Sequence, residues 1–305
     1  MHLRLFLFLS FILLATAPGW SQSALGTPTP VSSPFYPFGV RVSSELAFFN
    51  LSDLNSNQAS LQYNLQQLQN STPSYNYKAQ TTTLNSAVVF EINPFVAINP
   101  NIDAGVAFDY WAFTPLNFDQ TDIHPVYFHD YEHTLNAIEI NAKLRFYLFN
   151  VAKSGVRVFL EPSAGFQPIN YELSEPYQHT TNNPSDNQVG DNVNATAFDA
   201  GLQAGIVLPF TSWFSYSFSG GFEYAYATNF TGTWSDAGVP AKNGVSGTNR
   251  FYNVPNSGPG YIAFTPSDPN NYALFGLTQA LVNDSRPMVV DLSGIHLSMA
   301  MNFLF

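Results

Sequence analysis

The 305-residue sequence has no cysteine, few charged residues and no long hydrophobic run after its first two dozen residues. The lack of cysteine excludes a disulfide scaffold, a cysteine-ligated zinc site, a thiol nucleophile and a lipid on an N-terminal cysteine. Charged residues make up 10% of the chain, whereas a soluble domain carries about 25%, which argues against an ordinary cytosolic protein. A bundle of membrane helices is also excluded, because each helix needs about 20 mostly apolar residues.

Positive charge is especially scarce. Ten Lys and Arg against 21 Asp and Glu give a net charge of -11, which leaves no basic surface for nucleic acid. We therefore expect no nucleic-acid partner. Aromatic residues are abundant instead, with 28 Phe and 16 Tyr. A disordered chain would not carry so much apolar, β-favouring surface, so the fold must cover it.

The N-terminal segment has the three parts of a secretory signal peptide. His2 and Arg4 precede an apolar run at residues 5–15, and small residues follow around residues 21–24. The run is shorter than the roughly 20 residues of a membrane anchor. Residues 24–38 contain four prolines and cannot form a regular strand ladder. We predict a signal peptide at 1–23, a Pro/Ser-rich linker at 24–38, a folded domain at 39–305 and an exported protein.

Apolar residues alternate with polar or small residues through eight segments of the chain. These are residues 40–49, 84–92, 102–111, 138–148, 156–166, 198–208, 214–226 and 295–305. In 138–148, for example, Ile140 and Leu144 fall on one face, while Lys143 and Arg145 fall on the other. A period of two is that of a strand with two different faces, so the sequence predicts an all-β fold.

The polar faces carry charges of both signs among small residues, whereas the apolar faces carry no charge. The charged residues singled out are Arg41, Glu45, Glu91, Glu139, Lys143, Arg145, Arg157, Glu161, Asp199 and Glu223. The interior of an eight-stranded barrel is just wide enough for side chains, so we predict that these residues line a lumen. The Phe and Tyr residues of the apolar faces suit the aromatic girdles of a membrane barrel. A soluble sandwich is the alternative, because it shows the same period.

Connections of two lengths alternate along the chain. Short turns are expected at 98–101, 150–155 and 209–213, and long connections at 51–82, 114–133, 172–193 and 229–287. This asymmetry predicts a transmembrane antiparallel up-and-down β-barrel with short periplasmic turns and long extracellular loops. Residues 261–265 and 272–282 have the composition of further strands, so ten strands are the alternative to eight. Leu61, Leu65 and Leu68 have helical spacing and predict a short amphipathic turn.

The last segment ends on alternating apolar residues that include Met301, Phe303 and the terminal Phe305. It resembles the C-terminal β-signal of bacterial outer-membrane barrels, and this resemblance implies recognition by the barrel assembly machinery. The whole pattern resembles the small eight-stranded barrels of the OmpA transmembrane-domain and OmpX type. That resemblance implies the outer membrane of a Gram-negative bacterium, contact with outer-membrane lipid and both termini in the periplasm.

One motif formally matches a zinc peptidase. Residues 129–133 read H-x-x-E-H, but that chemistry needs a helix to bring both imidazoles to one metal ion. In an extended chain His129 and His133 lie about 13 Å apart. We expect a solvated loop here, and loose metal binding by His124, His129, Asp130 and His133 is the alternative.

A second motif, His296-Leu297-Ser298, is similar to the H-x-S of lipid A deacylase barrels. In a strand the two polar residues lie about 7 Å apart, whereas a nucleophile needs its base within about 3 Å. We interpret both as lumen residues with partners such as Glu45 or Asp291.

The sequence therefore predicts a non-enzymatic barrel without a cofactor or metal. We expect it to act through its surface loops, where an extracellular ligand would bind, or as a structural component of the membrane. The lumen charges are expected to pair and form a closed plug, because unpaired buried charges are costly. Two alternatives remain: a small-solute or ion channel, and a lipid-modifying barrel enzyme.

Overall fold

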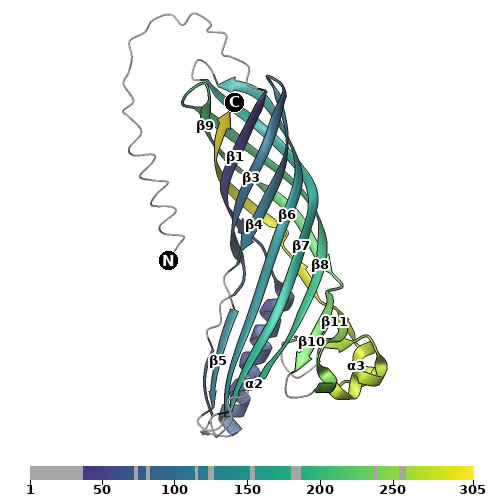
Figure 1. The fold of residues 1–305 in the computed structure, drawn as a ribbon. Coiled ribbons are helices and arrows are strands. Elements are labelled where there is room, and N and C mark those ends of the chain that lie inside the picture. Colours follow the sequence, from purple (N-terminus) through teal and green to yellow (C-terminus); the bar gives the residue numbers. More distant parts are fainter. Residues whose placement is uncertain are drawn as a thin grey trace, which may run out of the picture. The chain divides into compact units, whose positions relative to one another are not determined.

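Eight antiparallel strands close into a ring (Figure 1). They are β1 (Phe38–Phe48), β3 (Ser86–Asn99), β4 (Ile102–Ala112), β6 (Tyr127–Val151), β7 (Val156–His179), β8 (Asn187–Pro209), β9 (Phe214–Thr228) and β15 (Gly294–Leu304). Each pairs with the next in this order, and β15 completes the ring by pairing with β1. The computed structural model describes residues 37–71, 75–79, 83–113, 116–122, 127–151, 155–179, 187–236, 240–253 and 259–305. The prediction of an eight-stranded up-and-down barrel is confirmed.

The two faces of the wall differ as the alternation predicts. Outward apolar side chains such as Phe108, Ile140 and Phe222 are about half exposed, at 50%, 45% and 55%. Inward charged side chains such as Arg145 and Glu161 are buried, at 3% and 4%. A soluble sandwich would bury the apolar set instead, so the sandwich alternative is wrong.

The apolar outer face ends at a polar row on one side and an aromatic row on the other. Beyond the Phe166–Phe198 ring pair, the outer surface changes to asparagine, and Asn170 donates hydrogen bonds to the side chains of Asn192 and Asn194. At the turn end of the wall the rings of Phe210, Trp213, Phe214, Tyr216 and Phe303 contact one another. An apolar band between two such rows is the outer surface of a membrane-spanning barrel.

The short turns lie where they were predicted, between β3 and β4, between β6 and β7 and between β8 and β9. The long connections are not plain loops. They contain α2 (Ser52–Ser71), β2 (Tyr75–Ala79), β5 (Leu116–Asp122), β10 (Thr231–Asp236), η2 (Pro240–Lys242), β11 (Val245–Tyr252), β12 (Tyr261–Pro266), η3 (Pro269–Phe275), α3 (Gln279–Asn283), β13 (Ser285–Pro287) and β14 (Val289–Asp291).

These elements prolong the wall beyond the apolar band. β5 continues the pairing of β4 with β6, and β10 continues the pairing of β9 with β8 after a break at Asn229, which has a positive φ of 59°. We call this part the extension: α2, β2, β5, β10–β13, η2, η3, α3 and the parts of β6, β7 and β8 beyond Asn136, Asn170 and Asn194.

The ten-stranded alternative is wrong. Residues 261–266 do form a strand, β12, but it pairs with β11 in the extension and not with the barrel. The second candidate segment, 272–282, is helical, because Asp268 caps η3 and Thr278 caps α3 with their side-chain oxygens. Local capping therefore outweighs the β-favouring composition of this segment.

The helix α2 is 20 residues long, whereas the sequence predicted one short turn. Its residues are mostly Ser, Asn, Gln and Leu, and three side chains tie it to other segments. Asp53 accepts hydrogen bonds from Arg286 and from the Val289 amide, Asn55 bonds the Leu84 backbone, and Asn57 accepts from the Ile262 amide. The side chains of Leu61, Leu65 and Leu68 lie outside the described residues. Among the residues that the structure describes, no helix has the length and apolar character to cross a membrane.

The last strand occupies the seam of the barrel. The Phe305 amide donates to the Phe38 carbonyl at 2.8 Å, and the Leu304 amide donates to the Trp213 carbonyl at 2.8 Å. Met301 and Phe303 are half-buried on the outer face, and Phe305 is exposed at 68%. Recognition of this strand by the assembly machinery stays a prediction. So do the signal peptide and most of the linker, because residues 1–36 lie outside the described residues.

Candidate functional site in the barrel lumen

The lumen charges form layers, and the layer nearest the short turns holds two arginines on one carboxylate. Arg41 Nη1 donates to Glu161 Oε2 at 2.8 Å, and Arg145 Nε donates to the same oxygen at 2.6 Å. Arg41 Nε also donates to Asn302 Oδ1 at 3.0 Å, and the Arg145 guanidinium lies 3.7 Å from the Phe159 ring centroid. All five side chains are buried, so this layer fills the lumen with paired charge.

The next layer is centred on Lys143. Its ammonium forms an ion pair with Glu91 and lies 4.0 Å from Asp109 Oδ2. These residues come from β6, β3 and β4, which are neighbours in the wall, and Glu91 and Asp109 are directly paired in register. A single lysine therefore serves two carboxylates.

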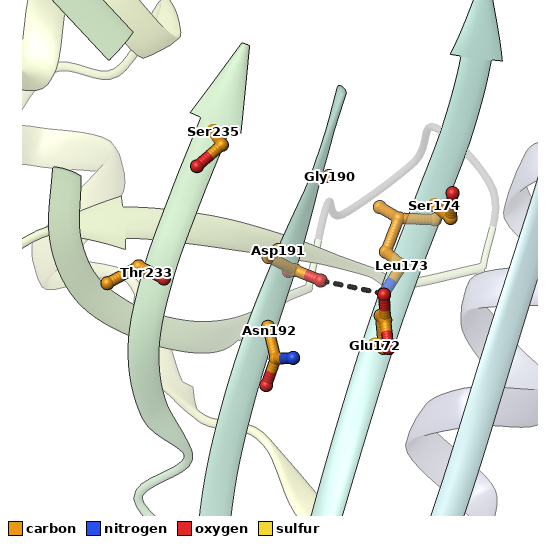
Figure 2. A pocket seen from close by; sticks show the side chains of 8 residues that line it. All are labelled: Glu172, Leu173, Ser174, Gly190, Asp191, Asn192, Thr233 and Ser235. Carbon is orange, nitrogen blue, oxygen red and sulfur yellow. Dashed lines mark hydrogen bonds between the residues drawn. The ribbon is translucent and has the colours of Figure 1, made fainter. Parts of the chain in front are cut away.

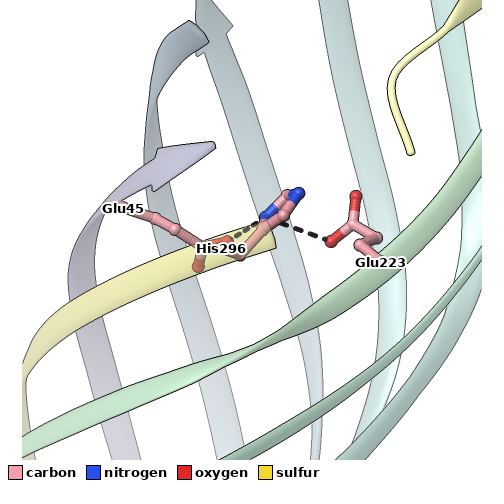
Figure 3. A group of neighbouring side chains, drawn as sticks. All are labelled: Glu45, Glu223 and His296. Carbon is pink, nitrogen blue, oxygen red and sulfur yellow. Dashed lines mark hydrogen bonds and ion pairs between the residues drawn. The ribbon is translucent and has the colours of Figure 1, made fainter. Parts of the chain in front are cut away.

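Beside it, His296 lies between two glutamates (Figure 3). Its Nδ1 bonds Glu45 and lies 3.6 Å from Glu223 Oε2. Glu45 also accepts from Gln203 at 3.4 Å, and Gln203 in turn accepts from Ser219 at 2.8 Å. The prediction that His296 faces the lumen with Glu45 as its partner is confirmed; Asp291 is not among the partners that the structure gives it.

Two further carboxylates lie deeper in the lumen. Glu139 accepts from the Trp111 indole Nε1 at 2.9 Å and from Asn141. Asp199 is fully buried, and neither of its oxygens accepts a hydrogen bond from the described residues. The charged groups of Glu139 and Asp199 are both carboxylates, so this level of the lumen is acidic.

Arg157 differs from the other nine predicted lumen residues, because it is only half-buried and lies at the turn end of the barrel. Its guanidinium lies 3.3 Å from the Tyr147 ring centroid and donates to the Pro100 carbonyl. The Tyr147 hydroxyl donates to Asp103 at 2.7 Å. Arg157 therefore lies at the turn end of the lumen, while the other nine predicted residues are buried inside it.

The lumen holds far more acid than base. Its buried carboxylates are Glu45, Glu91, Asp103, Asp109, Glu139, Glu161, Asp199 and Glu223, and its buried permanent cations are Arg41, Lys143 and Arg145. The sequence predicted a mixture of both signs, and Asp103 and Asp109, which fall on the polar face of residues 102–111, join the ten charged residues that it singled out. Eight carboxylates with three permanent cations cannot all form separate ion pairs.

Above the charges, toward the extension, the lumen is filled by an apolar core that we call the apolar stopper. It consists of Ala47, Phe49, Leu51, Leu54, Leu84, Ala87, Val89, Trp111, Leu135, Ala137, Ile169, Tyr171, Val193, Ala197, Ala225, Ala227, Phe230, Phe264, Met288, Val290 and Leu292. None is more than 7% exposed. These side chains are therefore packed against one another and have little contact with water.

The apolar stopper was not predicted from the sequence. Its one visible signal is that the strand alternation fails at its edge, where apolar residues occur on both faces, as at Val88, Val89 and Phe90 and at Met288, Val289 and Val290. A strand with two apolar faces is buried on both sides or faces lipid on one.

The extension has an open pocket of about 210 Å³ on β7, β8 and β10 (Figure 2). Its lining includes Glu172, Asn192 and Thr233, and Asp191 Oδ1 accepts from the Leu173 amide at 3.1 Å. Burial raises the pKa of Asp191 to about 7, against the opposing effect of the hydrogen bond from the Leu173 amide.

The histidine motif at 129–133 does not form a helical zinc site, because β6 runs through it as a strand. His133 is buried, its Nδ1 is hydrogen bonded to the Tyr171 hydroxyl at 2.7 Å, and burial lowers its pKa to about 4. The side chains of His129 and Asp130 lie outside the described residues, as does His124. Loose metal binding in this segment stays a prediction.

No protein-family model matches the sequence, and no curated protein matches it. Among solved structures, the chain is similar to the crystal structure of a major outer membrane protein from Thermus thermophilus. The two are 11% identical, the match covers 87% of this chain and 99% of that one, and the TM-score is 0.38. The strand pairings themselves establish the architecture: a closed eight-stranded antiparallel barrel with an apolar outer face and buried charged residues in its interior.

Proposed function

We propose that this protein is an integral outer-membrane barrel whose lumen does not conduct and whose extension, on the cell surface, carries its function. In this proposal the short turns face the periplasm, and the barrel is an anchor without enzymatic activity. Closure of the wall suits that role, because every strand has two neighbours and no backbone edge meets lipid.

The apolar stopper is the main support for a lumen that does not conduct. Buried residues from seven of the eight barrel strands, together with Leu51, Leu54 and β14, fill the space that a pore would need. The ion pairs of Arg41, Arg145 and Glu161 add a second, polar obstruction nearer the turns. An ion crossing both would have to disrupt buried ion pairs and then enter an apolar core, and each step is costly.

A non-enzymatic role is supported by the position of the polar residues. His296 and Ser298 point into the lumen and not toward lipid, and the His296 Nδ1 is occupied by Glu45. A base for a lipid-directed nucleophile would have to face the acyl chains or a groove open to them.

Single-channel recording in planar bilayers tests the closed lumen. We expect no steady open events from the purified chain, with a known porin in a parallel bilayer as a control for the recording conditions. Resistance to unfolding in SDS without boiling would show that the reconstituted chain is folded. Reproducible openings from the folded protein would contradict the proposal and favour the channel.

Surface labelling tests the orientation, and the absence of cysteine makes it free of background. Asp284→Cys places a thiol on an exposed position of the extension, and Thr211→Cys places one on an exposed short turn. We expect a membrane-impermeant maleimide to label Asp284→Cys in intact cells. The matched Thr211→Cys variant should react only after the outer membrane is permeabilised; the reverse pattern would overturn the orientation.

A further inference from the structure

Three carboxylates meet at one level of the lumen. Glu139 of β6, Asp199 of β8 and Glu223 of β9 each offer an oxygen, and these three oxygens lie within 4.8 Å of one another. The three side chains are 1%, 0% and 6% exposed. Three ionised carboxylates so close together in a water-poor interior repel one another strongly.

Some oxygens of these carboxylates have hydrogen-bonding neighbours and others have none. Glu139 is held by Trp111 and Asn141, and Glu223 Oε2 faces His296, which is itself bonded to Glu45 (Figure 3). The other oxygen of Glu223, Oε1, has no hydrogen-bond partner among the described residues.

Asp199 has no compensating donor group. It is completely buried, and its carboxylate oxygens accept no hydrogen bond from an N–H or O–H group of the described residues; its neighbour within hydrogen-bond reach is the carboxyl group of Glu223. An ionised carboxylate offers about four lone-pair positions, and burying it unpaired costs several kcal/mol. The nearby Lys143 ammonium is already bound to Glu91 and lies 4.0 Å from Asp109. The two buried arginines among the described lumen residues, Arg41 and Arg145, both bind Glu161.

We propose that Glu139, Asp199 and Glu223 together bind one hard divalent cation of the calcium class inside the lumen. An ion centred among three oxygens that are at most 4.8 Å apart lies within about 2.8 Å of each, and a small closure reaches the roughly 2.3–2.6 Å of a calcium–oxygen bond. The all-carboxylate donor set of Glu139, Asp199 and Glu223 favours calcium or magnesium over zinc.

The position of the site determines how the cation would enter and leave. The apolar stopper covers one side, and the layer of Arg41, Arg145 and Glu161 covers the other. The cation therefore enters while the barrel closes and then exchanges slowly. It acts as a structural ion that offsets the negative charge of the excess buried carboxylates. Its loss lowers the stability of the folded barrel.

The test begins with the full chain refolded into detergent, free of lipopolysaccharide, in millimolar calcium or in EDTA. Free metal is removed by gel filtration in EDTA, and bound calcium is measured by atomic emission. We expect close to one calcium per folded chain in the first sample and none in the second. The calcium-loaded protein should keep its folded band in SDS to a higher temperature. A parallel sample with magnesium alone determines which of the two cations is preferred.

Asp199→Asn is the diagnostic variant, and Asp191→Asn is its matched control, because Asp191 is a second buried aspartate of β8 that lies in the extension. We expect at least a tenfold loss of calcium affinity for Asp199→Asn and no change for the control. Glu223→Gln provides a second variant if Asp199→Asn does not fold.

Three outcomes would overturn the proposal. The first is that the folded wild-type chain retains neither calcium nor magnesium. The second is that Asp199→Asn binds calcium as the wild type does. The third is that calcium leaves the wild-type heat resistance unchanged while Asp199→Asn raises it in metal-free buffer, which would mean that shared protons compensate the carboxylates.

Discussion

Replacing Glu161 by glutamine is the most direct test of the charge network. The substitution keeps the size of the side chain but removes the negative charge that two buried guanidinium groups share, at 2.8 Å from Arg41 and 2.6 Å from Arg145. Removing one partner of a buried ion pair costs about 3–5 kcal/mol, because the remaining charge stays buried and unpaired. The glutamine carbonyl can still accept one hydrogen bond, so we expect a loss near the lower end, about 3 kcal/mol.

The measurement is urea unfolding of the chain in lipid vesicles, followed by tryptophan fluorescence. Glu172→Gln is the matched control: it makes the same change on the same strand, but in the extension, where the side chain is only half-buried. We expect the control to change the free energy of unfolding by less than about 0.5 kcal/mol. An equally small change in the free energy of unfolding for Glu161→Gln would show that these ion pairs do not stabilise the barrel. They could then not serve as a second obstruction in the lumen.

Three further predictions concern the extension and assembly. Asp53→Ala removes the acceptor for both Arg286 nitrogens, at 2.6 and 2.5 Å, and for the Val289 amide. This substitution should lower the stability of the extension by about 2 kcal/mol. The loss should appear as faster proteolysis beside α2 while the barrel stays intact, and an unchanged cleavage rate would show that Asp53 does not stabilise the extension. Asp191 has a pKa raised to about 7 in the folded chain, so the unfolded chain loses its proton first. Stability of the extension should therefore fall as pH rises from about 4 to 7. Hydrogen-exchange protection factors of the extension, corrected for the intrinsic pH dependence of exchange, should fall over that range in the wild type and change less in Asp191→Asn. An equal slope of protection against pH in both proteins would contradict the assignment. Phe305→Ala should lower the amount of folded barrel in cells but not refolding in detergent, and equal losses in both assays would argue against recognition by the assembly machinery.

The two faces of the wall could be assigned from the amino-acid order without any structure. Alternation over residues such as Leu144 and Arg145 tells inside from outside, because successive side chains of a strand point in opposite directions. The alternation of short and long connections indicated the order of the strands. The Phe and Tyr residues on the apolar faces indicated which face meets the membrane. These are local properties, and they need no knowledge of which strand lies beside which.

Which side chains meet across the lumen became clear only from the folded chain. Glu161 is 120 residues from Arg41, and His296 is 251 residues from Glu45. Both pairs depend on strand register and on the stagger of the closed barrel. The alternation of apolar and polar residues contains no information about either. The apolar stopper and α2 were beyond prediction for the same reason. Alanines such as Ala225 and Ala227 look like ordinary strand residues in the sequence, and only the folded chain shows that they belong to one buried cluster with residues such as Leu51 and Leu84. The weakly amphipathic α2 is held by Arg286 and Leu84, which are distant in sequence.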